Sequence, residues 1–504
     1  MRFPPQSFVN ALISAAKNDE WRKVMIYDVV IVGAGVTGSM TARELTKYKL
    51  SVCILEKADD ACAGSSKANS AIVHAGFDAE NGTLKAKLNV RGCEMMPEVC
   101  RELDVHYKNT GSLVVSFSEE DGKALDTLYK RGVANGVKGM KIVSGEEMRK
   151  IEPHLSENAR AALYAPTAGI VCPYELTIAA AENAVQNGAD VMFGFEVSSI
   201  TEKDGYYEVS DGKETVYARY VVNAAGLYSD VIAKLTGDCD FEIIPRKGEY
   251  MLYDKSCDGF VRTVLFSAPT KEGKGVLVAP TVDRNTLVGP NAERTVKDDT
   301  ATTAEGLADI AKNAARLVSL PLPSRKTITS FAGVRPTPTG GDFVIKKSAH
   351  MKGVLHLAGI ESPGLASSPA TAEYAAGLLS EMGLRLEKNE SFCPTRQRVV
   401  RFREMNDEER AALIKENPAY AKIICRCETV TEGEIIDAIR RPMGARTVDG
   451  VKRRARAGLG RCQGGFCMPR VAEILSRELG VPLTEITKDG KGSDLLVGKT
   501  KEGN

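Results

Sequence analysis

The segment Ile26-Tyr-Asp-Val-Val-Ile-Val-Gly33-Ala-Gly35-Val-Thr-Gly38 decides the fold of this chain. Its apolar first half, rich in Val and Ile, predicts a buried parallel strand over 26–32. A helical stretch follows the glycines as far as Tyr48, and a second strand over 50–55 ends at Glu56. A glycine-rich turn between a strand and a helix, with an acid closing the next strand, indicates a dinucleotide-binding unit.

The three glycines and Glu56 of this unit each have a structural reason. Gly33 permits the tight turn, Gly35 lets the backbone approach a pyrophosphate, and Gly38 lets the helix pack closely on the strand. The helix N-terminus offers free N–H groups and a positive dipole end to the phosphates. We expect Glu56 to bind the ribose hydroxyls.

Bulk properties place the chain among ordinary globular proteins. Its 504 residues predict two or three domains, and the 43% hydrophobic and 26% charged content is typical of them. The net charge of +1 gives no reason to expect that the chain as a whole binds nucleic acid or an acidic membrane surface. No apolar run is long enough to span a bilayer. Twelve scattered cysteines and the lack of an evident secretory signal favour a reducing cytoplasm.

Charge is uneven along the chain. From Arg396 to Arg470 there are 17 Lys or Arg against 10 Asp or Glu, an excess of seven positive charges. This excess favours either a basic setting for an anionic group, a docking face for an acidic partner, or an ordinary solvated surface.

Two further glycine turns follow strands far downstream. They are Val221-Val-Asn-Ala-Ala-Gly226-Leu-Tyr-Ser-Asp230 and Leu357-Ala-Gly359-Ile-Glu-Ser-Pro-Gly364. A cofactor held by three separated segments is larger than NAD, so the sequence favours FAD.

With these turns the chain resembles the FAD-dependent oxidoreductases of the D-amino-acid oxidase superfamily over about residues 25–385. Within it, the chain is most similar to the L-2-hydroxyglutarate and glycerol-3-phosphate dehydrogenase branches. The similarity lies in the segments 64–76, which includes His74, and 84–88, and in Ser330-Phe-Ala-Gly-Val-Arg335-Pro. The resemblance implies FAD contacts from Ser65, Ser66, Asn69, Ala225 and Gly226, and from Gly364 and Leu365 at a helix start facing the flavin pyrimidine.

A flavin that oxidises an alcohol needs a base and a cation for the substrate's anionic group. His74 is the candidate base, because imidazole titrates near neutral pH; the alternative is a histidine that only bonds the cofactor. Arg335 is the candidate anion clamp, since its fork suits carboxylate or phosphate. Lys247 replaces the arginine usual in this family, so it offers a point charge suited to phosphate as well. Glu249 and Tyr250 are expected to support these groups.

A four-cysteine pattern, Cys425-x-Cys427 followed by Cys462-x4-Cys467, lies near the C-terminus. Four thiolates suit an iron–sulfur cluster or a tetrahedral zinc. The spacing, with Gly460-Arg-Cys-Gln-Gly-Gly-Phe-Cys467, closely resembles the bacterioferritin-associated ferredoxin-like [2Fe–2S] domain, and this resemblance implies that all four cysteines bind the cluster. The other eight cysteines are predicted to be small buried residues.

The predicted fold class is α/β: a Rossmann-like FAD-binding domain with an inserted α+β substrate domain, plus a small helical [2Fe–2S] domain. The expected divisions are an extension over 1–24, FAD-binding parts over 25–96, 161–240 and 331–386, substrate parts over 97–160 and 241–330, a linker over 387–419, the [2Fe–2S] domain over 420–485 and a tail over 486–504.

A flavin beside a one-electron centre predicts a redox enzyme that exports electrons. The same two-part organisation occurs in the large subunit of anaerobic glycerol-3-phosphate dehydrogenases. The resemblance therefore implies oxidation of sn-glycerol 3-phosphate to dihydroxyacetone phosphate, with electrons passing through the cluster to an acceptor protein. L-2-hydroxyglutarate oxidation, amine or opine oxidation, and an iron-handling binding protein are the alternatives. The acceptor is a second flavoprotein, a quinone-linked subunit or a soluble carrier.

Overall fold

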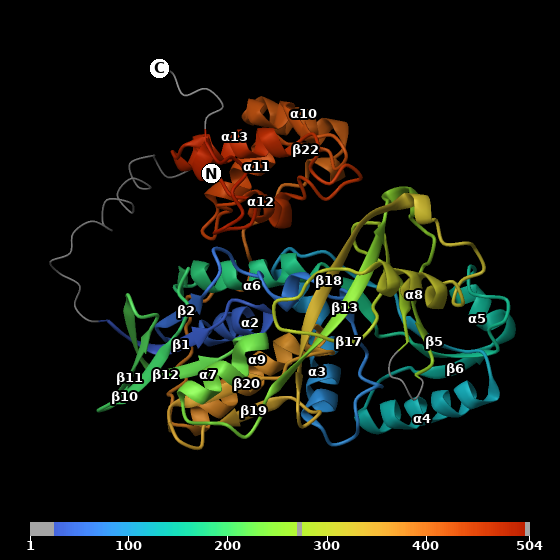
Figure 1. Ribbon diagram of the computed structural model, residues 1–504, viewed down its shortest axis with the longest axis horizontal. Coiled ribbons are helices and arrows are strands. Elements are labelled where there is room, and N and C mark those ends of the chain that lie inside the picture. The colour runs from blue at the N-terminus through green and yellow to red at the C-terminus, as the bar shows by residue number, and fades with distance from the viewer. Residues whose placement is uncertain (1–24, 270–274, 499–504) are drawn as a thin grey trace.

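The computed structural model describes residues 25–269 and 275–498. Two large sheets and their helices form the body of the molecule, and a small C-terminal helical module packs on one side of it (Figure 1). The predicted extension over 1–24 lies outside the described residues. No helix within the described ranges is long and apolar enough to cross a membrane.

The first sheet contains the predicted dinucleotide-binding unit. Strand β1 occupies Ile26–Val32, as predicted, and β2 begins at Val52, two residues later than expected. The parallel pairings are β1 with β2 and β12, β2 with β9, and β12 with β20, so the carboxyl ends of these strands meet at one edge. The antiparallel strands β10, β11 and β19 extend the sheet on the β12 side, whereas the parallel strand β9 forms the other edge. The strands are β1, β2 (Val52–Glu56), β9 (Asp190–Phe193), β10 (Ser199–Lys203), β11 (Tyr206–Ser210), β12 (Thr215–Asn223), β19 (Val344–Lys347) and β20 (Val354–Ala358).

Helices cover this sheet and form the main core with it. Helix α2 (Val36–Leu45) is buried along its whole length between α6 (Pro173–Gln186) and α9 (Gly364–Glu381). Helix α3 (Leu84–Glu102) packs on α9, and α7 (Ser229–Leu235) lies near β20. The core is built from alanine, valine, leucine and isoleucine of these elements, so the glycine turn sits on a rigid base.

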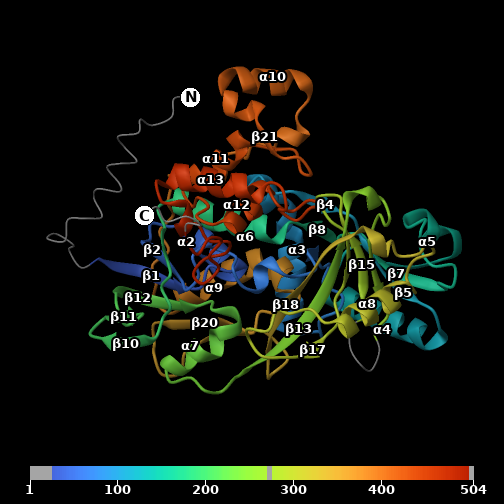
Figure 2. The same cartoon turned by 45° about the horizontal axis from the view of Figure 1, so that its top comes forward.

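A second, mixed sheet forms the other half of the body. Its longest ladder pairs β13 with β18 through eleven antiparallel residue pairs. Helices α4 (Glu119–Asn135), α5 (Gly145–Ile151) and α8 (Ala304–Ala314) flank the sheet (Figure 2). The strands are β5 (Ser112–Ser116), β6 (Lys141–Ser144), β7 (Ala161–Ala165), β13 (Ile243–Tyr253), β14 (Val264–Ser267), β15 (Leu277–Pro280), β16 (Thr286–Gly289), β17 (Glu293–Arg294) and β18 (Thr327–Pro338).

A small sheet of β3 (Ile72–Val73), β8 (Gly169–Val171) and β4 (Tyr107–Asn109) lies between the two halves. Three of the expected divisions fall inside elements: 96/97 in α3, 330/331 in β18 and 419/420 in the short 3-10 helix Pro418–Ala421. We propose that these divisions lie at the ends of those elements, since a continuous helix or strand belongs to one packing unit.

The C-terminal module has its own apolar core. After α10 (Asp407–Glu416) come β21 (Ile423–Cys425), β22 (Val430–Thr431), α11 (Glu432–Arg440), α12 (Val448–Ala455) and α13 (Met468–Leu479). Helix α11 begins at Glu432, and α13 begins at Met468, directly after Cys467. Helix α12 ends because Arg456 adopts a left-handed conformation with φ of 66°.

Candidate cofactor cavity and cysteine centre

A cavity of about 880 Å³ opens where the parallel strands of the first sheet end. Gly33 after β1, Glu56 of β2 and Ala225 after β12 all line it. The carboxyl edge of a parallel sheet is the usual ligand site of such folds. Residues 329–334 of β18 form the facing wall, so the cavity lies between the two sheets.

The glycine turn fits a dinucleotide. Gly33 has φ of 110°, and a Cβ there would lie 2.6 Å from the Ala224 carbonyl oxygen. A Cβ on Gly38 would collide with the Gly33 carbonyl oxygen, so this glycine allows the close approach of α2 and the turn. Gly35 is the N-cap of α2, has no side-chain cap and lines the cavity. The start of α2 therefore offers its backbone to an anionic ligand.

Glu56 sits beside the turn at the end of β2. Its carboxylate accepts hydrogen bonds from the Ala34 N–H at 2.7 Å and the Ala58 N–H at 2.9 Å. Burial raises the pKa of Glu56. The backbone bonds hold its position, and a carboxylate oxygen with two lone pairs can still accept from a ribose hydroxyl.

Ser65, Ser66 and Asn69 belong to the segment between β2 and β3. Ser66 Oγ accepts the Val36 N–H at 2.9 Å, at the start of α2, while Ser65 Oγ donates to the Val334 carbonyl at 2.6 Å. Asn69 Nδ2 donates to the Ser66 carbonyl at 3.0 Å. All three line the cavity, and their bonds fix its wall to α2 and β18.

Four further predicted cofactor residues occupy two turns. Ala225 and Gly226 line the cavity, and Gly226 has φ of 56°. Gly364 and Leu365 begin α9 but are not among the lining residues; their neighbour Ile360 is.

The predicted reaction residues are not among the residues that line the cavity. The partly buried His74 follows β3, and its ring stacks on Phe266 with the centroids 5.7 Å apart. Arg335 is also partly buried, and its Nη2 donates to the Asn291 carbonyl at 3.1 Å. Val334 and Pro336, on either side of Arg335, line the cavity.

Lys247 and Arg335 point to opposite faces of the second sheet. Arg335 is the register partner of Arg246, whereas Lys247 pairs with Val334, and side chains alternate along a strand. The Lys247 amino group lies 2.9 Å from Asp299, and this bond raises its pKa. The structure therefore does not bring the two predicted cations together. Glu249, also predicted near the site, instead accepts the Thr303 N–H at the start of α8.

The four module cysteines converge as two pairs. Cys427 and Cys462 have their sulfurs 3.6 Å apart, and Cys467 donates a hydrogen bond that lowers the pKa of Cys425. Within residues 25–269 and 275–498, no three His, Cys, Asp or Glu side chains group as one metal ion requires. Two thiolate pairs suit a two-iron cluster, in which each iron takes two sulfurs, better than one tetrahedral zinc.

The loop around the cysteines supports thiolates. Gly464 has φ of 91°, which turns the chain between Cys462 and Cys467. Burial opposes ionisation of Cys462, but hydrogen bonds from Cys427 and from the Phe466 and Gly464 backbone N–H groups lower its pKa. Cys425 and Cys467 are buried, whereas Cys427 is exposed, so the centre has an inner and an outer side.

The module also lines the cofactor cavity, which the sequence analysis did not anticipate. Leu459 and Gln463 of the cysteine loop belong to the lining, and Gln463 directly follows Cys462. The basic stretch over 396–470 is the sequence signal that points to this contact. Val171, Cys172, Tyr174, Asp283, Asn285 and Thr329 are further lining residues that the sequence analysis missed, since no motif marks them.

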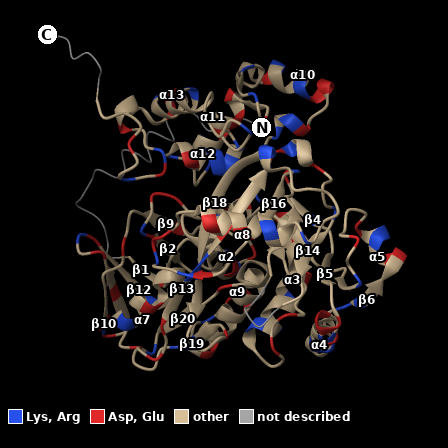
Figure 3. Ribbon diagram, turned by 45° about the vertical axis from the view of Figure 1, so that its right-hand side comes forward, with Lys and Arg blue, Asp and Glu red and all other residues tan. Residues whose placement is uncertain are grey.

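Seven arginines of the basic stretch form ion pairs with acids of the body, so a solvated surface is the wrong interpretation for them. They are Arg396 and Arg453, which are buried, and Arg401, Arg403, Arg441, Arg454 and Arg456, which are partly buried. Figure 3 shows the Lys and Arg residues in blue.

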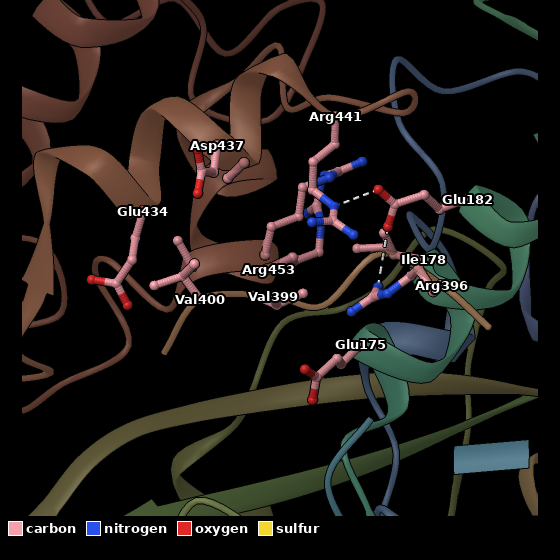
Figure 4. A pocket seen from close by; sticks show the side chains of 13 residues that line it. Glu175, Ile178, Glu182, Arg396, Val399, Val400, Glu434, Asp437, Arg441 and Arg453 are labelled. Atoms are coloured by element: carbon pink, nitrogen blue, oxygen red, sulfur yellow. Dashed lines mark hydrogen bonds and ion pairs between the residues drawn. The ribbon is translucent and has the colours of Figure 1, made fainter. Parts of the chain in front are cut away.

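Glu182 of α6 lies between Arg396 and Arg441, as Figure 4 shows. Asp60 bonds Arg453 at 3.1 Å and Arg454 at 2.7 Å. For these arginines the acidic partner lies within the chain itself.

The prediction that the other eight cysteines are buried is wrong for three of them. Cys239 and Cys393 are exposed and Cys257 is partly buried. Among the histidines, His106 is partly buried between Glu175 and Glu404, and His356 is buried in β20.

Comparisons with known proteins agree with these sites. The FAD dependent oxidoreductase family matches residues 28–378, and the BFD-like [2Fe-2S] binding domain matches residues 423–477. A Glycerol 3-phosphate dehydrogenase of Caloramator mitchellensis is 50% identical over 94% of this chain and 99% of its own length. The mitochondrial L-2-hydroxyglutarate dehydrogenase of Nematostella vectensis is 33% identical over 53% of this chain and 62% of its own.

A solved structure of L-alpha-glycerophosphate oxidase from Mycoplasma pneumoniae with FAD bound is 31% identical and covers 74% of this chain and 98% of its own, with a TM-score of 0.70. The predicted fold class and both predicted cofactors are confirmed. The chain thus belongs to the family of FAD-dependent oxidoreductases and carries a BFD-like [2Fe–2S] binding domain over residues 423–477.

Proposed function

We propose that the protein oxidises sn-glycerol 3-phosphate to dihydroxyacetone phosphate and passes the electrons through its [2Fe–2S] cluster to an acceptor protein in the cytoplasm. The substrate assignment is supported by the similarity, over nearly the full length of both chains, to a dehydrogenase named for glycerol 3-phosphate. That likeness includes the cysteine module as well as the flavin domain.

Bound FAD supplies a two-electron acceptor for the hydride, and the cluster supplies a one-electron carrier. Oxidation of the secondary alcohol releases a hydride from carbon and a proton from the hydroxyl group. We assign the proton to His74 and the phosphate to Arg335. Support for Arg335 is that the residue is partly exposed and belongs to the strand that faces the cavity.

Lys247 has a lesser role in this proposal. Its amino group is bound to Asp299 on the sheet face opposite Arg335, which favours a positioning role through β13. Gly364 and Leu365 begin α9, and its N-terminus would favour negative charge on the reduced flavin.

The path for electrons is suggested by the cysteine loop. Leu459 and Gln463 border the cofactor cavity, and Cys462 is adjacent to Gln463. On the outer side, Cys427 is exposed and Phe466 has 86% of its surface accessible. An apolar ring beside an exposed ligand suits transfer to a docked protein.

Anaerobic bleaching of the flavin tests the substrate. The oxidised enzyme is mixed with sn-glycerol 3-phosphate, L-2-hydroxyglutarate or sarcosine, and flavin absorbance is followed. Fast bleaching by glycerol 3-phosphate alone is the expected result. A flavin that stays oxidised with glycerol 3-phosphate and bleaches with another compound refutes the assignment.

L-2-hydroxyglutarate is the second candidate, since the segment around His74 resembles that branch. The relatives of that name match only about half of this chain. Glycine oxidases and an L-proline dehydrogenase at 25% identity or less share the fold, which leaves amine oxidation with little support.

A further inference from the structure

The [2Fe–2S] module supplies one wall of the FAD cavity. The lining residues from this module are Asp449, Lys452, Arg453, Arg456, Leu459 and Gln463. The match to the FAD-dependent oxidoreductase family ends at residue 378, so these residues lie outside the part of the chain that the family assigns to FAD.

The basic face of α12 lies on the phosphate side of the cavity. Ser66 Oγ accepts the Val36 N–H at the start of α2, and the next residue, Lys67, lies 3.0 Å from Asp489. Asp489 in turn lies 2.9 Å from Arg453 of α12. This bridge ties α12 to the loop beside the glycine turn, where a pyrophosphate is expected.

The cations of this wall differ in how closely acidic side chains pair with them. Arg453 bonds Asp60 and Asp489. Lys452 has no hydrogen-bonded carboxylate among the described residues: its nearest carboxylate oxygen belongs to Asp449, at 3.7 Å.

Arg456 is committed as well, bonding Asp283 at 2.5 Å and Glu428 at 2.9 Å. Asp449, the acid nearest to Lys452, is itself engaged by Lys488 at 2.9 Å. Lys452 is therefore the cation of this wall whose charge the protein balances least.

Lys452 is also partly removed from water. Its side chain is 29% exposed, and its stem lies over Gly458, where a Cβ would come within 3.9 Å of the lysine Cγ and Cδ. Burial lowers the pKa of Lys452. A poorly neutralised cation that borders an anion-binding cavity is stabilised when the anion arrives.

We propose that Lys452 binds the pyrophosphate of FAD, so that the cofactor is held from both the flavin domain and the cluster module. Retention of FAD then requires the cluster module to be packed against the flavin domain, and an enzyme whose module is displaced loses flavin. The inference concerns cofactor binding and holds whichever alcohol is the substrate.

Reconstitution of the full-length apoenzyme tests the proposal without measuring turnover. Flavin is removed, and the dissociation constants of FAD and of ADP are measured by titration for the wild type, Lys452→Gln, Lys452→Arg and Lys422→Gln. Lys422 is the matched control: it belongs to the same module, is exposed, pairs with Glu432 and does not line the cavity. Iron and acid-labile sulfide report whether the module stays intact.

Lys452→Gln should weaken both FAD and ADP by roughly tenfold, the effect of losing one charge-assisted bond. Lys452→Arg should restore most of the affinity, and Lys422→Gln should change nothing. An unchanged FAD constant in Lys452→Gln overturns the proposal. If that variant loses iron, Lys452→Met, which keeps the stem over Gly458, takes its place with the same two outcomes. Failure of the wild type to bind FAD would instead remove the proposed function.

Discussion

Arg335 and Lys247 illustrate how the chemistry of a residue can be inferred while its direction cannot. Both are cations in segments that resemble the family's substrate site, but β-sheet alternation sends them to opposite faces. Register is set by pairing between β13 and β18, which lie about eighty residues apart in the sequence, so no local pattern reveals it.

Replacing Arg335 with Met tests the anion clamp. The variant keeps an apolar stem and loses the charged fork, so we expect KM for glycerol 3-phosphate to rise roughly thirtyfold or more. FAD content should remain at the wild-type level. Steady-state kinetics and the flavin spectrum measure the two effects.

The control for Arg335 is Arg294→Met, an exposed arginine at the edge strand β17. Loss of FAD from the Arg335 variant would show that this arginine is structural.

Replacing Cys462 with Ser separates the two redox centres. Flavin reduction by substrate should proceed at the wild-type rate, because the flavin domain is untouched. Reduction of a protein acceptor should fall at least a hundredfold, since loss of a thiolate ligand disrupts the cluster. Cys393→Ser, at an exposed cysteine of the linker, serves as control. Acceptor reduction that persists in an iron-free Cys462 variant would contradict the relay.

Elements with a strong local pattern could be predicted from the sequence, and those defined by tertiary contact could not. The apolar run of β1 is a local signal, and that strand was correctly placed. The position of α12 depends on ion pairs with residues of the body that lie nearly four hundred positions away in the sequence, such as Asp60. The same holds for cavity residues like Asp283, which no motif marks.

His106 joins the linker to the body and gives a pH dependence to this contact. Hydrogen bonds to Glu175 and then Glu404 raise the pKa of His106 to about 9. The folded pKa lies above the unfolded value near 6.5, so the stabilisation is complete below about pH 6.5 and is lost as pH rises through about 9. The melting temperature should therefore fall between pH 7 and pH 10.

In His106→Gln this part of the pH dependence should disappear, while stability at pH 10 should match the wild type. His350→Gln, at an exposed histidine, is the matched control. Parallel melting curves for wild type and His106→Gln across this range would show that the ion pair contributes nothing.

On the scale of the whole molecule, ion pairs hold the cluster module against the body. Asp283, from a loop of the second sheet, bonds Arg403 at 2.6 Å and Arg456 at 2.5 Å. Glu428, next to Cys427, accepts from Arg403, Arg456 and Lys255. Two buried acids and three cations thus connect the flavin cavity to the cysteine loop.

Asp283→Asn should weaken the contact between the cluster module and the body. Removing one member of a buried ion pair leaves uncompensated charge and costs about 3 kcal/mol. Substrate should still bleach the flavin, but electron transfer from flavin to cluster should slow, which rapid mixing with detection at cluster wavelengths measures. Asp258→Asn, whose partner Arg284 is exposed, is the control. An unchanged cluster reduction rate would assign Asp283 no role in docking.

Phe466 offers a test of where electrons leave the molecule. It lies between two cluster ligands with 86% of its surface exposed, and an apolar side chain in that position gains free energy only when a partner covers it. Phe466→Ala should therefore weaken docking of a protein acceptor and slow its reduction about tenfold, because truncating an apolar anchor at the centre of an interface typically costs 1–2 kcal/mol. A small dye that needs no docking should be reduced as fast as by the wild type. Leu483→Ala, at an exposed leucine elsewhere in the module, controls for loss of apolar surface alone. Equal slowing with dye and protein would mean that the mutation damages the cluster, and no slowing with either would place the outlet on another face.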